Sequence, residues 1–565
     1  MNATEPRLRV GVLCDGPVLQ HWQAECLRQV LAVEGVGLVL VVRPAPTPPV
    51  VRGAVQRVLR HPWRIALYLR YRRRHFKPAA MEPVDVTELL QGVPQITCAV
   101  EKRGHGQYFR TQDLDRIRAH RPDVLLRFGF NILRGEVLEV ATHGVWSFHH
   151  GDEEHYRGGP PGFWELLRGE PVMGAVLQRL TDKLDGGRIL HKGWFGVVDH
   201  SLRETVDTVL RHSASWPALV MRRLLAGDAD AASGRQSPTT APILRYPGNL
   251  TFLRFLFVQL RNKLRFHKAS LDRHEEWNIG VLNQPIHRLL EEKPSLNVRW
   301  LPAPAERSFR ADPFGFTDAE GQLHVLYEKY DHARAKGEIA RLRPKRDNVL
   351  KRSRTLLDLP EHLSYPFVLT HEGRTCVIPE QAARGRVQLY VIDDALSRME
   401  PVATLLEEPL FDPTPVHWNG RWWLFGTKAP LTNAELFLYH AADLHGPYVP
   451  HPRNPVKTDV RSARPAGTPF VHQGALYRPG QDSSLTYGGR VVLHRVLELS
   501  PTAFREEAVR TVGPITNSAY AKGLHTVSAV GDVTLVDGKR FMRVKDKAAR
   551  ERARKWNALL ERLRP

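Results

Sequence analysis

The sequence contains few cysteines and lacks the segments that mark export or membrane insertion. Only four cysteines occur among 565 residues, and no two of them form a Cys-x-x-Cys pair. This pattern argues against a disulfide-stabilised fold and against a structural zinc site, so we expect no metal and a reducing compartment. No apolar run reaches the ~18 residues that a membrane-spanning helix needs. Residues 1–16 lack a basic stretch followed by an apolar core, so we expect no signal peptide and a cytoplasmic location.

Positive charge is abundant, but three segments hold it. The chain carries 81 Lys and Arg against 60 Asp and Glu, a net charge of +21. Residues 52–77 hold nine basic and no acidic side chains, 254–268 hold five and none, and 539–565 hold eleven and three. Because these segments account for the whole excess, the rest of the chain is nearly neutral, which argues against a nucleic-acid partner.

The three basic segments are candidate amphipathic helices, predicted near 53–74, at 249–268 and at 546–565. One interpretation is a core-facing helix with a solvated basic face. The other is a helix that lies on an anionic membrane. We expect the second, which would place the protein peripherally on the inner face of the membrane.

Residues 1–228 have the pattern of an α/β domain. Short apolar runs alternate with helical stretches, which is typical of a parallel, Rossmann-like sheet with crossover helices. A helix is predicted over 202–225, and a linker that contains the second basic helix over 229–290. The predicted strands are 8–13, 38–42, 124–128, 144–148, 175–180 and 194–198.

Residues 291–545 change to short strands separated by glycine turns. Five segments share the order strand, polar turn with glycine, strand, and they recur at spacings of 47 to 64 residues. Such a repeat predicts an all-β five-bladed propeller, because stacked blades bury apolar faces that one hairpin leaves exposed. The turn glycines are Gly321, Gly373, Gly420, Gly474 and Gly538.

One string of the α/β domain carries a resemblance to a known family. Residues 144–190 contain Trp-Ser-Phe-His-His, then Tyr-Arg-Gly-Gly, then Leu-Asp-Gly-Gly. This string resembles the formyltransferase N-terminal domain family, which includes methionyl-tRNA formyltransferase and sugar N-formyltransferases, and the resemblance covers about residues 8–228. It implies formyl transfer from N10-formyltetrahydrofolate to an amine.

The resemblance assigns catalytic roles within this string. It aligns His149 with the family's catalytic His and Asp185 with the catalytic Asp, while Ser147 occupies the position of an Asn. The His would stabilise the oxyanion, the carboxylate would support proton removal, and Ser147 would replace the amide donor. The resemblance implies cofactor contacts at Phe128, Gly129, Asn131 and Leu133, and a substrate loop with His150, Asp152, Tyr156 and Arg157.

The substrate expected from this resemblance is a small amine rather than a tRNA. The tRNA-acting members of the family continue into a small β-barrel, whereas this chain continues into a linker and a propeller. We therefore expect a small-molecule or lipid-linked amino sugar.

The propeller region contains the strings FRADPFGF, VIPEQ, LFDPTPVHWNGRWWLFGT and GLHTVSAV. Through these and similar strings it resembles the family-43 glycosidases and, more closely, the N-terminal propeller of the glucosamine inositolphosphorylceramide transferases. The resemblance implies a ligand mouth near the propeller axis, lined by Asp312, Glu380, Asp412 and His525. Asp312 matches the base position of the glycosidases, but no Glu matches their acid motif, so glycan binding is favoured over hydrolysis.

Two functions follow from these observations. The first is a folate-dependent formyltransferase of glycan or glycolipid biosynthesis whose propeller holds the glycan. The second is a degenerate formyltransferase fold that serves as a binding module, beside a glycan-binding or glycoside-active propeller.

Overall fold

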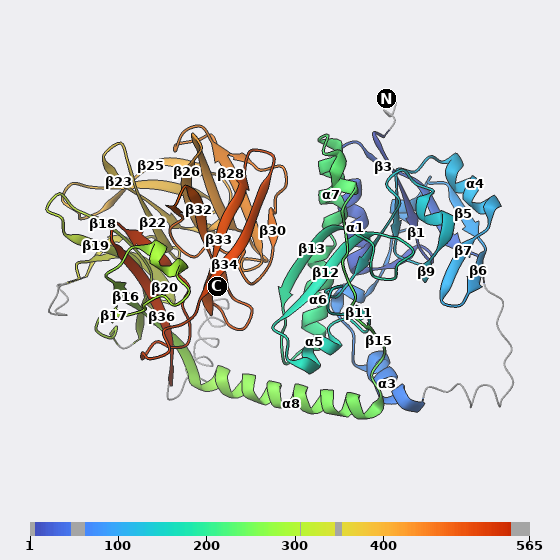
Figure 1. Ribbon diagram of the computed structural model, residues 1–565, viewed down its shortest axis with the longest axis horizontal. Helices are drawn as coiled ribbons and strands as arrows, with labels where there is room; N and C mark the ends of the chain where they lie inside the picture. The colour runs from blue at the N-terminus through green and yellow to red at the C-terminus, as the bar shows by residue number, and fades with distance from the viewer. Residues whose placement is uncertain (1–5, 47–62, 306, 345–352, 544–565) are drawn as a thin grey trace, which may run out of the picture. The chain divides into compact units, whose positions relative to one another are not determined.

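The computed structural model describes residues 6–46, 63–305, 307–344 and 353–543 (Figure 1). The chain divides into two compact units, residues 1–264 (unit 1) and 265–565 (unit 2), and the division falls inside helix α8 (Asn249–Asp272). The domain boundaries predicted at residues 228, 290 and 545 would separate segments that fold independently, and they stay a prediction. The predicted helix at 546–565 and the first part of the one near 53–74 lie outside the described residues.

Unit 1 is built on an eight-stranded sheet with the order β14-β13-β12-β10-β8-β1-β3-β5. The five strands from β10 to β5 run parallel, and β12, β13 and β14 continue the sheet in antiparallel pairing. The predicted parallel-sheet region is therefore confirmed. The strands are β1 (Leu8–Leu13), β3 (Val36–Pro44), β5 (Gln95–Cys98), β8 (Val124–Arg127), β10 (Val145–His149), β12 (Val172–Arg179), β13 (Arg188–Gly196) and β14 (Arg235–Gln236).

The helix predicted over 202–225 is two helices. Helix α6 (Leu202–Ser213) begins at Ser201, whose hydroxyl accepts a hydrogen bond from the Glu204 amide. Helix α7 (Trp216–Leu225) follows after a short break, and Pro217 stands in its first turn, where no intrahelical N–H donor is needed. Among the described residues, the other α-helices that lie wholly within unit 1 are α1 (His21–Leu31), α3 (Ala66–Arg74), α4 (Thr111–Ala119) and α5 (Phe163–Arg168).

Over the residues that the structure describes, unit 2 consists of five antiparallel sheets. Four follow one another along the chain, β18–β21, β22–β25, β26–β30 and β31–β34. The fifth has the order β17-β16-β36-β35 and joins the two ends of the unit, because β16 pairs with β36 from Arg273 opposite Arg543 to Leu282 opposite Thr534. The chain is therefore multidomain and mostly β, with one parallel-sheet region. Closure of the five sheets into a propeller stays a prediction.

The strands of unit 2 are short, as the repeat predicts. They are β16 (Arg273–Leu282), β17 (Arg299–Trp300), β18 (Ser308–Thr317), β19 (Leu323–Asp331), β20 (Lys336–Leu342), β21 (Arg354–Leu357), β22 (Ser364–His371), β23 (Arg374–Glu380), β24 (Val387–Ile392), β25 (Met399–Leu406), β26 (Phe411–Trp418), β27 (Arg421–Thr427), β28 (Glu435–Ala441), β29 (Val449–Pro450), β30 (Lys457–Thr458), β31 (Phe470–His472), β32 (Ala475–Asp482), β33 (Arg490–Leu499), β34 (Phe504–Val512), β35 (Val527–Val530) and β36 (Val533–Arg543).

Four of the five predicted turn glycines stand in hairpin turns, with φ between 72° and 75°. Gly538 does not, because it lies inside β36, where an added Cβ would come within 2.3 Å of the Trp300 ring. The turn of that hairpin is at Gly531, whose φ is 55°. Gly538 therefore accommodates a close aromatic contact, a second reason for glycine in a strand.

Candidate functional site

In unit 1 the structure brings His149 and Asp185 together. His149 ends β10, its Nδ1 atom lies 3.5 Å from Oδ1 of Asp185, and its Nε2 atom lies 2.8 Å from the carbonyl oxygen of Tyr156. The other oxygen of Asp185 accepts a hydrogen bond from the Gly158 amide. Both ring nitrogens of His149 are thus turned toward groups of the protein itself.

Ser147, two residues earlier on β10, faces a cation. Its buried hydroxyl accepts a 3.0 Å hydrogen bond from Nε of Arg127, and Nη1 of Arg127 donates to the carbonyl oxygens of Phe130 and Asn131. Burial lowers the pKa of Arg127, although Asp185 works to raise it. The same hydroxyl donates a 3.5 Å hydrogen bond to the Phe148 carbonyl oxygen, so the group expected to donate to an oxyanion already has partners within the protein.

The four residues predicted to contact a cofactor lie in different surroundings in the structure. Asn131 lines a cavity of about 470 Å³ together with Lys102, His105 and Arg127. Gly129 packs tightly on the backbone of Asp15, where an added Cβ would lie 2.6 Å from a carboxylate oxygen. Phe128 and Leu133 belong instead to two hydrophobic clusters of the unit.

The predicted substrate loop is held by internal contacts. Asp152 accepts hydrogen bonds from Lys192 and Trp194, and Arg157 donates to the carbonyl oxygens of Ala241 and Leu184. The ring of His150 stacks on that of Phe148. Burial, and to a smaller extent the neighbouring His149, lowers the pKa of His150 to about 3.

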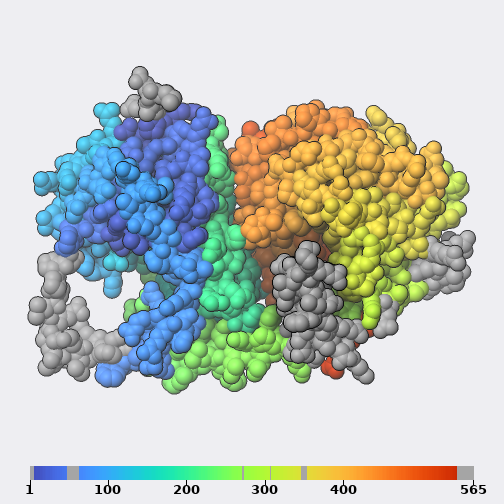
Figure 2. Space-filling view, turned by 180° about the vertical axis from the view of Figure 1, so that it is seen from behind, coloured from blue at the N-terminus to red at the C-terminus, as the bar shows by residue number. Residues whose placement is uncertain are grey.

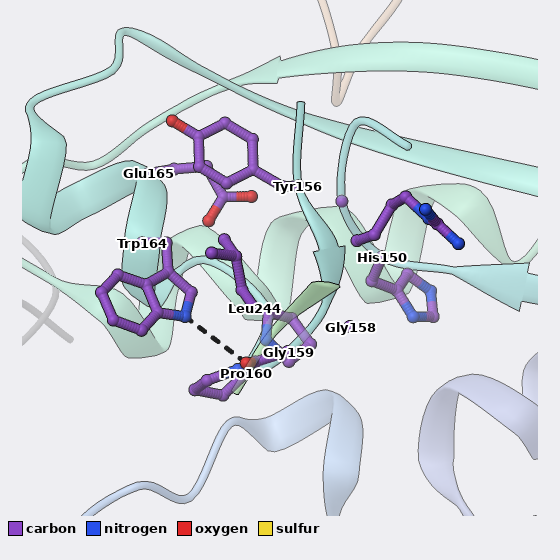
Figure 3. A pocket seen from close by; sticks show the side chains of 11 residues that line it. His150, Tyr156, Gly158, Gly159, Pro160, Trp164, Glu165 and Leu244 are labelled. Carbon is purple, nitrogen blue, oxygen red and sulfur yellow. Dashed lines mark hydrogen bonds between the residues drawn. The ribbon is translucent and has the colours of Figure 1, made fainter. Parts of the chain in front are cut away.

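Figure 3 shows the cavity beside this loop, with Tyr156 and Glu165 near one another and His150 apart from them. The indole of Trp164 donates to the Gly159 carbonyl at its lower edge. The cavity measures about 10 Å³, which is room for about one water molecule.

In unit 2 three strands repeat the same local distortion. β18, β22 and β26 each carry an irregularity at an X-Pro step, Asp312-Pro313, Tyr365-Pro366 and Asp412-Pro413. The residue before each proline has a positive φ, 51°, 43° and 50° respectively. A left-handed conformation in a non-glycine residue costs of the order of 1–3 kcal/mol and is concentrated at functional sites.

The Asp312 side chain lies at the centre of a buried network. Oδ1 accepts a 2.7 Å hydrogen bond from the Thr526 hydroxyl, and Oδ2 accepts one from the Tyr365 amide. Nε2 of His525 lies 3.4 Å from Asp312, and its Nδ1 lies 2.6 Å from Asp537. Burial works to lower the pKa of His525, but Asp537 and then Asp312 raise it above the ordinary value.

Asp412 is held by a buried guanidinium. Nε and Nη2 of Arg464 donate to its two oxygens at 2.6 and 3.0 Å, and the Gln481 amide donates a third hydrogen bond. The same Arg464 lies 4.0 Å from Glu380, which also accepts a hydrogen bond from the Ser364 hydroxyl. The four residues predicted for the ligand mouth, Asp312, Glu380, Asp412 and His525, thus belong to one connected polar cluster.

This cluster forms the floor of a pocket of about 420 Å³. The lining includes four carboxyl groups, one guanidinium, three histidines and several aromatic rings, namely Glu275, Asp312, Glu328, Glu380, Arg464, His332, His362, His525, Trp277, Phe309, Tyr330, Phe411 and Tyr487. Asp412 is absent from the lining of this pocket because it lies behind Arg464, with 2% of its surface exposed.

Three of the four carboxyl groups that line the pocket hold their protons more tightly than usual. Burial, with further contributions from neighbouring acids, raises the pKa of Asp312 to about 6 and that of Glu380 to about 8. Burial is the largest cause that raises the pKa of Glu328 well above its ordinary range, and Asp312 and Glu380 add to it. At neutral pH Glu380 is therefore mostly protonated, and a protonated carboxyl can donate a hydrogen bond as well as accept one.

Trp277 and Glu328 were not predicted from the sequence. Trp277 lies on β16, in the segment expected to be a linker, and its ring centroid lies 4.0 Å from that of His525. Glu328 interrupts the apolar residues of β19. A charged residue inside an otherwise buried strand was the available signal.

Two groups of three side chains among the described residues are close enough to hold a metal ion. They are Asp312 with His525 and Asp537, in the pocket, and His371 with Asp443 and His445, at the surface. In the first group the three side chains already interact with one another and with Thr526.

Comparison with known proteins places the recognisable similarity in unit 2. Residues 301–525 match the family model described as glucosamine inositolphosphorylceramide transferase 1, N-terminal. The curated protein of that name from Arabidopsis thaliana is 31% identical over 232 residues, 40% of this chain and 29% of that protein. The one from Oryza sativa subsp. japonica is 31% identical over 209 residues, 36% and 28% respectively. The chain thus spans less than a third of the length of these relatives.

Solved structures give fainter likenesses. A family 117 glycoside hydrolase, Zg3597 from Zobellia galactanivorans, has 15% identity and a TM-score of 0.31 over 42% of this chain and 87% of that one. Glycinamide ribonucleotide transformylase 1 from Symbiobacterium toebii has 16% identity and a TM-score of 0.25 over 39% and 88%. Likeness at this level carries no functional argument.

The prediction of a folate-dependent formyltransferase is wrong. The curated relatives are named for a transferase of inositolphosphorylceramide, not for one-carbon transfer, and nothing supports N10-formyltetrahydrofolate as a cofactor. Within unit 1 His149 and Asp185 lie together as the resemblance implies, whereas the hydroxyl of Ser147 is occupied by Arg127 and by the Phe148 carbonyl oxygen. The resemblance to the glucosamine inositolphosphorylceramide transferase family in unit 2 is confirmed.

Proposed function

We propose that unit 2 is a five-bladed propeller that binds the sugar of a glycan or of a lipid-linked sugar in the pocket around Asp312, Glu328 and Glu380. The observation that carries this proposal is the combination of buried carboxyl groups with aromatic rings in a cavity of about 420 Å³. A cavity of that volume accommodates a small ligand.

The chemistry of the pocket suits a sugar. Hydroxyl groups of a sugar both donate and accept hydrogen bonds, and a protonated carboxyl does the same. Phe309 and Tyr330 stack at the rim with centroids 4.6 Å apart and rings 5° from parallel, which gives a flat apolar surface beside the polar floor. The name of the relatives supports a glycolipid as the ligand. A lipid-linked sugar is the class of ligand that agrees both with this name and with the chemistry of the pocket.

For unit 1 we propose a binding role without one-carbon chemistry. The support is the cavity of about 470 Å³ lined by Lys102, His105, Arg127 and Asn131, which is large enough for a small ligand.

The experiment is a saturation-transfer NMR screen of the full chain against glucosamine, N-acetylglucosamine, galactose, arabinose and inositol phosphate, followed by calorimetry of the best ligand. Tyr330→Ala removes half of the stacked rim pair, and we expect it to lower affinity at least tenfold. Tyr477→Ala is the matched control, because Tyr477 stacks on Phe470 at 5.3 Å away from the pocket. Binding of no saccharide, or equal loss in both variants, would overturn the proposal.

A second candidate is acid–base chemistry at a glycosidic bond. It is favoured by the pKa values of about 6 for Asp312 and about 8 for Glu380, which lie on either side of neutrality in one pocket, as a base and an acid require. Release of sugar from aryl glycosides or glycolipids, abolished in Asp312→Asn while saccharide binding persists, would support it. Binding without any turnover would leave the pocket as a binding site alone.

A further inference from the structure

Helix α8 has two apolar faces, and only one of them packs against the protein. Phe252 and Phe255 are buried, and Phe255 stacks on Phe163 of α5 with centroids 4.4 Å apart. Farther along the same face, Gln259 and Asn262 donate hydrogen bonds to the carbonyl oxygen of Asp199. These contacts account for the inner face of the helix.

The opposite face exposes six large apolar side chains. At ~100° per residue they cover an arc of about 120° over a length of about 21 Å, centred roughly opposite the buried phenylalanines. The exposed fractions are 84% for Leu250, 67% for Phe257, 62% for Leu264, 57% for Leu260, 50% for Leu253 and 40% for Leu256. A contiguous apolar stripe on a surface marks an interaction site.

Basic side chains flank this stripe on both edges. Arg254 and Arg261 lie on one side of the arc and Lys263 on the other, and residues 249–268 contain no acidic side chain. The stripe therefore combines apolar area with positive charge, the two properties that bind a helix to an anionic bilayer.

Helix α3 extends the same surface. Asn249, the first residue of α8, accepts a hydrogen bond from the Leu67 amide and donates one to the Trp63 carbonyl. Figures 1 and 2 both show α3 beside the start of α8. Trp63 is 66% exposed and Tyr246 45%, and such rings favour the membrane–water interface.

We propose that the outer face of α8, with the adjoining Trp63–Leu67 segment, lies in the interface of an anionic membrane. No helix among the described residues is both long and apolar enough to cross a bilayer, so the orientation is parallel to the surface. A second copy of this chain fits less well, because its matching face carries the same positive charge. The proposal does not depend on the sugar pocket of unit 2.

The test is flotation of the full chain with phosphatidylcholine vesicles, with and without phosphatidylglycerol, at low and high salt. We expect binding only to the anionic vesicles, weakened by salt. The double variant Phe257→Glu/Leu260→Glu should lower the partition coefficient at least tenfold. The matched control is Val449→Glu/Val471→Glu, which adds the same charge at residues 50% and 56% exposed on unit 2 and should bind like the wild type.

Removal of basic side chains from the helix and measurement of the oligomeric state provide two further tests. Arg254→Gln/Arg261→Gln should lower binding and reduce its salt dependence, while all variants keep the wild-type melting temperature. Absence of binding to anionic vesicles, or equal binding by Phe257→Glu/Leu260→Glu and wild type, overturns the proposal. Concentration-dependent dimerisation that this variant abolishes, without vesicle binding, would identify a second copy as the occupant and overturn it too.

Discussion

Replacing Arg464 tests whether one buried ion pair, Arg464 with Asp412, stabilises the polar floor of the pocket. Arg464 binds both oxygens of Asp412, at 2.6 and 3.0 Å, and 2% of Asp412 is exposed. Arg464→Met keeps the length of the stem but leaves the Asp412 carboxylate with a hydrogen bond from the neutral Gln481 amide and no cation. Removing one partner of a buried pair costs about 3–5 kcal/mol, because the other charge stays buried and uncompensated.

Urea unfolding of unit 2, followed by tryptophan fluorescence, measures this loss. Adding Asp412→Asn to Arg464→Met removes the stranded charge, so we expect the double variant to recover about 2 kcal/mol or more. Arg478→Met is the matched control, since Arg478 pairs with Glu506 at 2.6 Å, is also buried (1% of its side chain is exposed, against 11% for Arg464) and lies outside the pocket. It should destabilise to a similar extent and leave saccharide binding unchanged in the folded protein. A loss below about 1 kcal/mol in Arg464→Met, or no recovery in the double variant, would refute the reasoning.

Three other changes have expected outcomes. Folding raises the pKa of Glu380 from an ordinary 4.5 to about 8, so the stability contributed by its protonated form is fully present below about pH 4.5 and is lost as the pH rises through about 8. In scanning calorimetry, Glu380→Gln should therefore melt at a higher temperature than the wild type at about pH 9 and at the same temperature at about pH 4.5. Gly467→Ala should cost more than ~3 kcal/mol, because φ is 114° and the added Cβ would overlap the Val527 carbonyl oxygen, and a normal unfolding midpoint would contradict this. Lys192→Met should destabilise unit 1 by about 3 kcal/mol at neutral pH, because Lys192 lies 3.0 Å from the fully buried Glu153, and a loss that persists undiminished in acid would count against charge as the cause.

Much of the fold was predictable because local patterns and tertiary contacts agree. The apolar run 8–13 forms β1 with the predicted bounds, and four glycines of the repeat stand in turns that require positive φ. The fifth turn was predicted at the wrong glycine, Gly538. The sequence alone does not distinguish a glycine that makes room for the Trp300 ring from a glycine that a turn requires. The break between α6 and α7 also escaped, since apolar periodicity continues across it.

The candidate site of unit 2 was predicted in part. Asp312 and Asp412 stood out because each precedes a proline at the start of a strand, and the structure gives both a positive φ. Trp277 could not be found in this way, because β16 acquires its place only by pairing with β36, more than 250 residues later in the chain. In unit 1 the motif placed His149 next to Asp185, but the partner of Ser147, Arg127, comes from another strand, and no local pattern announces it.

If a sugar binds in the pocket of unit 2 through hydrogen bonds with the protonated Glu380 carboxyl, its affinity falls as that carboxyl ionises, and calorimetric titration of the best saccharide at about pH 7 and about pH 9 measures this fall. We expect measurable affinity at about pH 7, a loss of at least tenfold at about pH 9, and weak binding by Tyr330→Ala at both. Equal affinity at the two pH values that Tyr330→Ala leaves unchanged would place the ligand elsewhere.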